Sequence, residues 1–232
     1  MRARVSLATL LVALSASANA RADDGFLFHP EGPGRWRVRV GAGGEFDLLP
    51  RALVESELRV VPRVAVHARL GMPWGFSADL TLRAVVLDNM AAAGVAWARA
   101  FGPFSVQVQS RFGAAFGWVF LDGFDLAFRS WILSPGVSFG LRVGPHRITL
   151  AVDGHVVLGQ SVDVGEATVS RARDRADALG ITLISETPAG RRGRIYLGVT
   201  ALIARPDWQL WLAFSDSNQP SLYPRFMVGY VF

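Results

Sequence analysis

Apolar and polar residues alternate over most of the chain, with the period of two that places successive side chains on opposite faces of a strand. Residues 76–87 are a clear case, because apolar residues stand at every second position with Ser77, Asp79, Thr81 and Arg83 between them. The same pattern predicts strands at residues 36–46, 63–71, 92–101, 104–120, 130–143, 146–161, 194–204, 208–215 and 222–232. It therefore predicts an antiparallel all-β fold of about ten strands, with about eight or twelve also compatible.

The connections between these strands alternate between short and long. Short turns are expected at residues 72–75, 102–103, 144–145 and 205–207, and longer loops near residues 48–62, 88–91, 121–129, 162–193 and 215–221. Pro50 and Pro62 leave the pairing of residues 48–62 open, because proline interrupts a strand ladder. We expect residues 162–193 to form a long external loop, either with a short helix or as an extended hairpin. Short turns on one side and longer loops on the other are typical of an up-and-down transmembrane barrel.

Alternation by itself fits two kinds of barrel: a soluble one with its apolar face inward, and a membrane one with that face outward. Aromatic residues on the apolar face gather near the strand ends, as in the girdles of membrane barrels. They are Trp36, Phe76, Phe104 and Trp208 at one rim, and Phe116, Trp118 and Trp131 at the other. The opposite face is rich in Gly, Ala and Ser, which suits a narrow, crowded interior. Both features favour the membrane barrel.

The last strand is apolar on one side and ends on an aromatic residue, with Phe226, Val228, Tyr230 and Phe232 at alternate positions. It resembles the closing strand of bacterial outer-membrane β-barrels. The resemblance implies a location in the bacterial outer membrane, among its lipids and lipopolysaccharide. It also implies that these four residues form the signal read by the barrel-assembly machinery. Oligomeric state is left open.

The first 35 residues divide into two segments ahead of a barrel at residues 36–232. Residues 1–22 read as an export signal peptide, because Arg2 and Arg4 precede an apolar run and small residues suited to cleavage after Ala20 or Ala22. Residues 23–35, rich in Gly and Pro, read as a flexible periplasmic lead-in. Cleavage after Ala20 removes Arg2 and Arg4 and leaves 22 basic against 19 acidic side chains, a net charge of +3 that does not indicate nucleic-acid binding. With no cysteine, disulfides are excluded.

Charged residues on the inward face predict a network in the lumen. Its members nearest mid-height are Arg39, His67, Arg83, Arg111, Asp153 and His155. Because buried charges are costly unless paired, we expect Arg111 to reach Asp153 across a strand that carries Gly136 and Ser138. This predicts a small barrel of structural or binding role with a plugged, Arg-rich lumen. A narrow, anion-preferring pore is the alternative.

A second alternative is a membrane-embedded hydrolase, because Asp153 and His155 share a face and that spacing could orient a general base. The sequence ties no nucleophile to this pair. The known lipid A deacylases carry a His-x-Ser pair, and none of the four histidines here has Ser two positions on. No metal site is indicated, because His67 and His155 would have to meet across the lumen. No nucleotide cofactor is indicated either, since the glycine-rich stretches are not followed by a helix. The sequence therefore favours a barrel without catalytic activity.

Overall fold

The computed structural model describes residues 25–50, 60–85, 89–121, 124–165, 167–172, 175–190, 193–205 and 220–232. Its strands are β1 (Val38–Leu48), β2 (Val60–Gly71), β3 (Phe76–Ala84), β4 (Asn89–Phe101), β5 (Phe104–Leu121), β6 (Phe124–Val143), β7 (His146–Val164), β8 (Ala167–Ala172), β9 (Arg175–Ala189), β10 (Gly193–Ala204) and β11 (Ser221–Val231). A single 3-10 turn, η1 (Pro73–Gly75), joins β2 to β3. No helix within the described ranges is long and apolar enough to cross a membrane.

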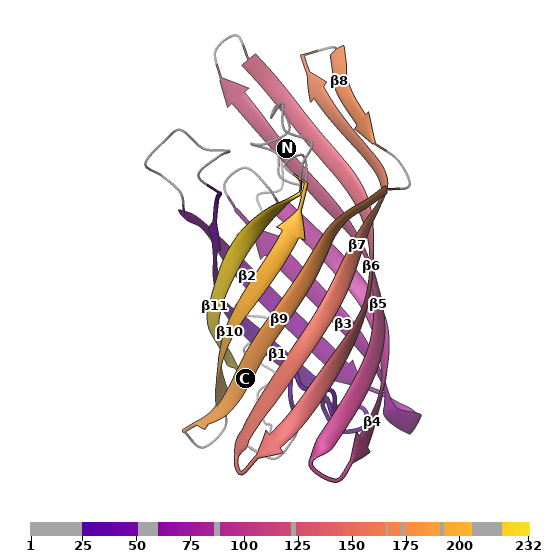
Figure 1. Cartoon of the computed structure of the whole chain (residues 1–232), viewed down its shortest axis with the longest axis vertical. Coiled ribbons are helices and arrows are strands. Elements are labelled where there is room, and N and C mark those ends of the chain that lie inside the picture. Colours follow the sequence, from indigo (N-terminus) through magenta and orange to yellow (C-terminus); the bar gives the residue numbers. More distant parts are fainter. Residues whose placement is uncertain are drawn as a thin grey trace, which may run out of the picture.

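Ten of these strands close into a tilted barrel (Figure 1). Strands β1 to β7 pair in chain order, β9 and β10 follow β7, and β11 pairs with both β10 and β1. All of these pairings are antiparallel. Most join strands that follow each other in the chain; the exceptions are β7 with β9, between which β8 lies in sequence, and β11 with β1, which closes the ring. β8 stands outside the ring, where it pairs with the far end of β7. The expected antiparallel barrel of about ten strands is confirmed.

The two faces of each strand differ sharply in exposure. Val38, Leu80 and Val228 are 52%, 44% and 43% exposed on the outer surface. Arg69 and Arg225, on the opposite face, are 2% and 8% exposed. Apolar side chains therefore cover the outside and charged ones fill the inside, as expected for a barrel whose solvent is lipid.

Aromatic residues of the outer face lie toward both ends of the barrel. Trp36, Phe76 and Phe104 are exposed beside the short connections. At the other end, Phe112 stacks on Trp131 and Phe116 on Trp118, with ring centroids 5.7 Å and 5.8 Å apart. Trp208, the remaining expected girdle residue, lies outside the described residues.

The loop expected at residues 121–129 is wrong, because β5 and β6 continue through it. Leu121 pairs with Phe124 at the tip of a long hairpin. On the inner face of that hairpin, Leu126, Phe128 and Ile132 pack into a buried apolar cluster with Val162. This packing explains why the strands continue beyond the expected span.

The long external loop expected at residues 162–193 is wrong for most of its length. β7 continues to Val164, β8 follows, and β9 is a full strand of the barrel wall. β9 takes the place in the ring that the sequence assigned to residues 208–215, which lie outside the described residues. Because Ala204 pairs with Ser221, residues 205–220 connect β10 and β11 at the end with the longer connections. The short turn expected at residues 205–207 lies, apart from Arg205, outside the described residues.

The flexible periplasmic lead-in expected at residues 23–35 is wrong for its described part, from Gly25 onward. Leu27 and His29 are 5% and 0% exposed, and their backbone is hydrogen-bonded to strands that are far away in sequence. Gly32 has a φ of 59°, a backbone conformation that glycine adopts without strain, and this allows the segment to turn sharply inside the barrel. The expected signal peptide, residues 1–22, lies outside the described residues.

Candidate functional site

Residues 25–35, which we call the plug, enter the barrel at the end where the short turns lie. The backbone N–H groups of Leu27, Phe28 and His29 donate to the carboxylate oxygens of Glu186 over 2.9, 3.1 and 2.8 Å. Glu186 belongs to β9 and is fully buried. Three donors in a row on one carboxylate form a strong, charge-assisted anchor. They hold the plug to a strand nearly 160 residues away in sequence.

Arg69 of β2 holds the plug from the other side. Its Nη1 donates to the carbonyl oxygens of His29 and Leu27 over 2.8 and 3.4 Å, and its Nε donates to Ser77. At the rim, Glu31 of the plug pairs with Arg142, beside the turn at residues 144–145. The plug thus has charged partners on three separate strands.

Glycines of the barrel wall make room for the plug. A Cβ at position 41 would lie 2.6 Å from Leu27 Cδ2, and one at position 140 would lie 2.3 Å from His29 Nε2. Both distances are shorter than real side chains tolerate, so Gly41 and Gly140 shape the seat of the plug. The sequence predicted a lumen rich in small residues. The structure shows that the plug fills the space beside two of them, Gly41 and Gly140.

The imidazole of His29 is buried in this seat. It lies 3.4 Å from Ser105 Oγ and meets the ring of Phe26 edge-on at 5.4 Å between centroids. Burial, and after it the positive charges of the surrounding arginines (Arg147, Arg142, Arg69 and Arg194), lower the pKa of His29 from 6.5 to about 3. His29 is therefore uncharged at neutral pH when the plug is seated.

Beyond the plug, charged side chains form two groups in the lumen. The first group centres on Glu45, which lies 3.1 Å from Arg83, 3.6 Å from Arg225 and 3.8 Å from His67. Asp47, two residues along β1, pairs with Arg225 and lies 2.9 Å from Arg63. The side chains of Glu45 and Asp47 are each 1% exposed, so this group is sealed inside the barrel.

The second group centres on Asp79 and Asp153, which flank Arg111. Arg111 lies 3.7 Å from Asp79 and 3.9 Å from Asp153. Gln109 Nε2 donates to Asp153 over 2.6 Å, and Arg111 donates to Gln109 over 3.0 Å. A Cβ at position 136 would lie 2.2 Å from Asp153 Oδ1, so Gly136 leaves the gap through which the carboxylate reaches Gln109 and Arg111.

The residues expected in a mid-height network occupy four places. Arg83 belongs to the first group, and Arg111 and Asp153 belong to the second. His67 contacts Thr81 at 3.3 Å as well as Glu45, while His155 Nδ1 lies 2.8 Å from Ser134 Oγ. Arg39 lies apart from them near the closing strand, where it donates to the carbonyl oxygen of Phe232.

Sequence reasoning missed several members of these groups, although a signal for them existed. Glu45, Asp47, Asp79 and Arg225 all continue the inward parity of their strands. Glu186 was missed because it lies on β9, which was assigned to a loop. Ser134 was not linked to His155 because their contact crosses between β6 and β7.

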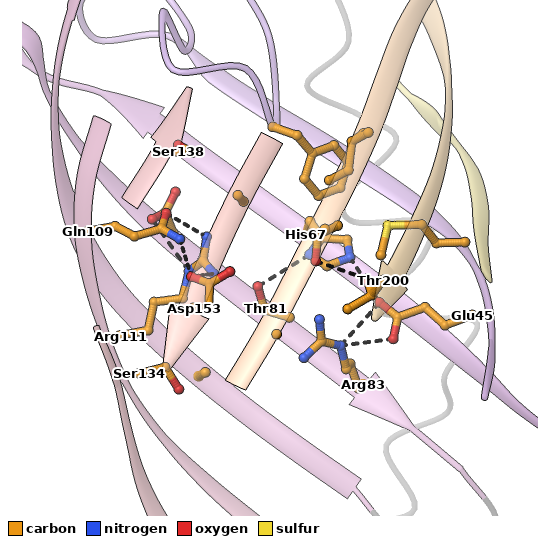
Figure 2. Close-up of a pocket in the computed structure, with 18 of the residues that line it drawn as sticks. Glu45, His67, Thr81, Arg83, Gln109, Arg111, Ser134, Ser138, Asp153 and Thr200 are labelled. Atoms are coloured by element: carbon orange, nitrogen blue, oxygen red, sulfur yellow. Dashed lines mark hydrogen bonds and ion pairs between the residues drawn. The ribbon is translucent and has the colours of Figure 1, made fainter. Parts of the chain in front are cut away.

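A cavity of about 120 Å³ lies between the two charged groups, with Leu27 and Phe28 of the plug contributing to its lining. Figure 2 shows Arg111, Gln109 and Asp153 on one side of this cavity and Arg83, Glu45 and His67 on the other. Hydroxyl groups complete the wall, from Thr81, Ser134, Ser138, Thr149, Thr182 and Thr200. The cavity suits water and small polar solutes and is smaller than the pockets that hold drug-sized molecules.

The chemistry of the cavity is that of paired charges and hydroxyl groups. Within the described ranges no cluster of three or more His, Asp and Glu side chains could hold a metal ion. For the hydrolase alternative, Asp153 is engaged by Gln109 and Arg111, and His155 contacts Ser134. The nearest nucleophile candidate is thus Ser134, which is 5% exposed inside the lumen.

A scan against protein-family models and a search of curated proteins found no match to this chain. Solved structures similar to it include Neisserial surface protein A, at 10% identity and a TM-score of 0.40, covering 84% of this chain and 95% of that one. The outer membrane phospholipase A of Escherichia coli has 10% identity and a TM-score of 0.38, covering 90% and 93% of the two chains. The translocator domain of the autotransporter NalP of Neisseria meningitidis has the same identity and TM-score, covering 97% and 94%. Likenesses this distant say nothing about activity.

The chain's own architecture carries the assignment to a membrane. Apolar side chains cover the outside of a closed antiparallel barrel, short turns lie at one end and longer connections at the other, and the buried charged side chains face the inside. This combination belongs to outer-membrane barrels, whose backbone polar groups are all paired around the ring. The protein is an outer-membrane β-barrel with Phe232 at the end of the short turns.

Proposed function

We propose that this protein is a non-conducting outer-membrane barrel with a structural or binding role, kept closed at its periplasmic end by its own N-terminal segment. The observation that carries the proposal is the anchoring of three consecutive plug amides on Glu186. Hydrogen bonds to a charged group contribute about 1.5–3 kcal/mol each, so this anchor is strong enough to favour a seated plug.

Side-chain packing supports the same function. Arg225, Asp47 and Glu45 are 8%, 0% and 1% exposed, and together they fill one side of the lumen beyond the plug. Small barrels fill their interior with side chains, and paired charges keep that filling stable in a low-dielectric surrounding. A continuous water-filled path is therefore not expected in the resting protein.

Planar-bilayer conductance tests this proposal. The full-length mature protein should give no steady single-channel steps, whereas a variant lacking residues 25–35 should give small, frequent steps. Heat-modifiable migration on gels serves as the control that both barrels are folded. Steady steps from the full-length protein, or silence from a folded variant without the plug, would contradict the proposal.

A narrow, anion-preferring pore is the second candidate, and one observation favours it. Four arginines and three carboxylates line the cavity, so the lumen carries an excess of positive charge. Anions would be preferred if the plug leaves its seat. The full-length protein distinguishes the two candidates, because only the pore requires it to conduct. Its reversal potential in a salt gradient would then show whether anions are preferred.

A further inference from the structure

The cavity between the two charged groups has an unbalanced charge. Its lining includes Arg69, Arg83, Arg111 and Arg225 against Glu45, Asp79 and Asp153, and the Asp47–Arg63 pair behind Arg225 adds one charge of each sign. The formal charges of these side chains, with His67 and His155 left out of the sum, are five positive and four negative, which leaves one positive charge. Strands backed by acyl chains surround that charge, and burying it without a counter-charge is costly.

Arg83 and Arg111 are the two arginines most open to the cavity. Their side chains are 21% and 29% exposed, against 2% for Arg69 and 9% for Arg225. Arg83 donates to Glu45 through Nε, while its Nη1 has only the weak acceptor Met90 Sδ at 3.9 Å. The two ion pairs of Arg111, at 3.7 and 3.9 Å, are both longer than a hydrogen bond. Both guanidinium groups therefore keep donor capacity that faces the cavity.

Two buried hydroxyl groups face the same space. Ser138 and Thr149 are 2% and 1% exposed and line the cavity, and neither side-chain oxygen has a hydrogen-bond partner among the described residues. Figure 2 shows Ser138 on the same side as Gln109 and Arg111, with Arg83 reaching in from the side of Glu45. Buried polar groups without a protein partner mark a place for a polar guest, and hydroxyl groups donate well to anionic oxygen.

We propose that this cavity binds one small oxyanion, held by the guanidinium groups of Arg83 and Arg111 and by the hydroxyl groups of Ser138 and Thr149. The anion supplies the missing negative charge, and its oxygens accept the donors that the protein leaves open. Guanidinium groups suit phosphate and carboxylate because they donate two parallel hydrogen bonds to either. The cavity, at about 120 Å³, limits the guest to a single small anionic group with a few waters. The proposal extends the proposed function, since the plug contributes to the lining through Leu27 and Phe28.

Equilibrium unfolding in urea, with the full mature protein in detergent micelles, tests the site. Because each sample refolds in the presence of the salt, access to a closed lumen is not required. Phosphate, acetate and chloride are compared at equal ionic strength. We expect phosphate or acetate to raise the urea midpoint in a saturable way and chloride to have no such effect. A response to phosphate alone identifies a tetrahedral oxyanion, and a response to acetate alone identifies a carboxylate.

Variants assign the effect to the cavity. Arg83→Gln and Arg111→Gln should each weaken the apparent affinity for the anion at least tenfold, and Arg83→Lys should weaken it less. Arg129→Gln is the matched control, since Arg129 is 73% exposed near the outer end and should leave the affinity unchanged. If an arginine variant does not fold, the comparison of phosphate and acetate with chloride on the unmodified protein still decides.

Two results would overturn the proposal. One is an equal response of the unmodified protein to all three anions, and the other is an unchanged affinity in folded Arg83→Gln and Arg111→Gln proteins. The conductance of the plug-deleted barrel is a separate measurement. If the full-length barrel does not conduct and is not stabilised by oxyanions, the anion site is refuted and the proposed plug stands. If the full-length barrel conducts and is stabilised by phosphate, the proposed plug is refuted and the anion site stands.

Discussion

Replacing Glu186 by alanine should release the plug. The carboxylate accepts the N–H groups of Leu27, Phe28 and His29, and at about 1.5–3 kcal/mol per charge-assisted bond the three contribute about 5–9 kcal/mol. Without the carboxylate, three buried N–H groups lose their acceptor and can reach water only if the segment leaves its seat. Burial of Leu27 and Phe26, at about 1.5–3 kcal/mol each, and the hydrogen bonds from Arg69 still favour the seated plug, so the lost anchor should raise the unseated fraction without emptying the seat completely.

Limited proteolysis and conductance measure that release. In Glu186→Ala, a protease added from the periplasmic side should cut within residues 25–35, and single-channel steps should appear. Glu186→Gln keeps one acceptor oxygen, so its extent of cleavage and its frequency of channel steps should lie between those of the unmodified protein and those of Glu186→Ala. Asp163→Asn is the matched control, because Asp163 pairs with the exposed Arg129 at the opposite end of the barrel. A folded Glu186→Ala barrel that stays silent and protected would refute the reasoning.

Three further predictions concern the plug, the lumen and the outer belt. The pKa of His29 is about 3 when seated and 6.5 when free, so seating is at full strength above pH 6.5 and weakens by about 1.4 kcal/mol per unit as pH falls toward 3. Protease cleavage of the plug should accordingly rise from pH 7 to pH 5, and less so in His29→Gln. Gly136→Ala should destabilise the barrel by about 1–3 kcal/mol in urea because its Cβ meets the carboxylate of Asp153, whereas Gly154→Ala, whose Cβ would come only within 3.9 Å of Pro135 O, should change little. Leu80→Arg, in the middle of β3 on the lipid face, should cost about 2–4 kcal/mol in lipid vesicles, and a cost near zero would contradict the placement of the membrane.

Period-two alternation is a local property, and it was enough to predict the barrel. It placed apolar residues such as Leu80 outside and Arg83 inside, and it located nine of the strands of the ring approximately. The tight turns at residues 102–103 and 144–145 followed from Gly-Pro pairs, which cannot continue a strand ladder. Each of these features depends on neighbours within a few residues.

The errors came where long-range contacts decide the structure. The sequence placed residues 175–189 in a long external loop, and only their pairing with β7 and β10 makes them part of the wall. The plug has no alternation, because its backbone bonds to the carboxylate of Glu186 and to Arg69 instead of joining a ladder.

The sequence by itself determined which side chains enter the lumen, since facing follows from parity along each strand. Only the tertiary structure decided which partners meet there. Arg225 and Asp47 are 178 residues apart and face each other because β11 closes the ring on β1. Pairing across a closed barrel depends on register and on the space left by residues such as Gly136, and neither is encoded within a single strand.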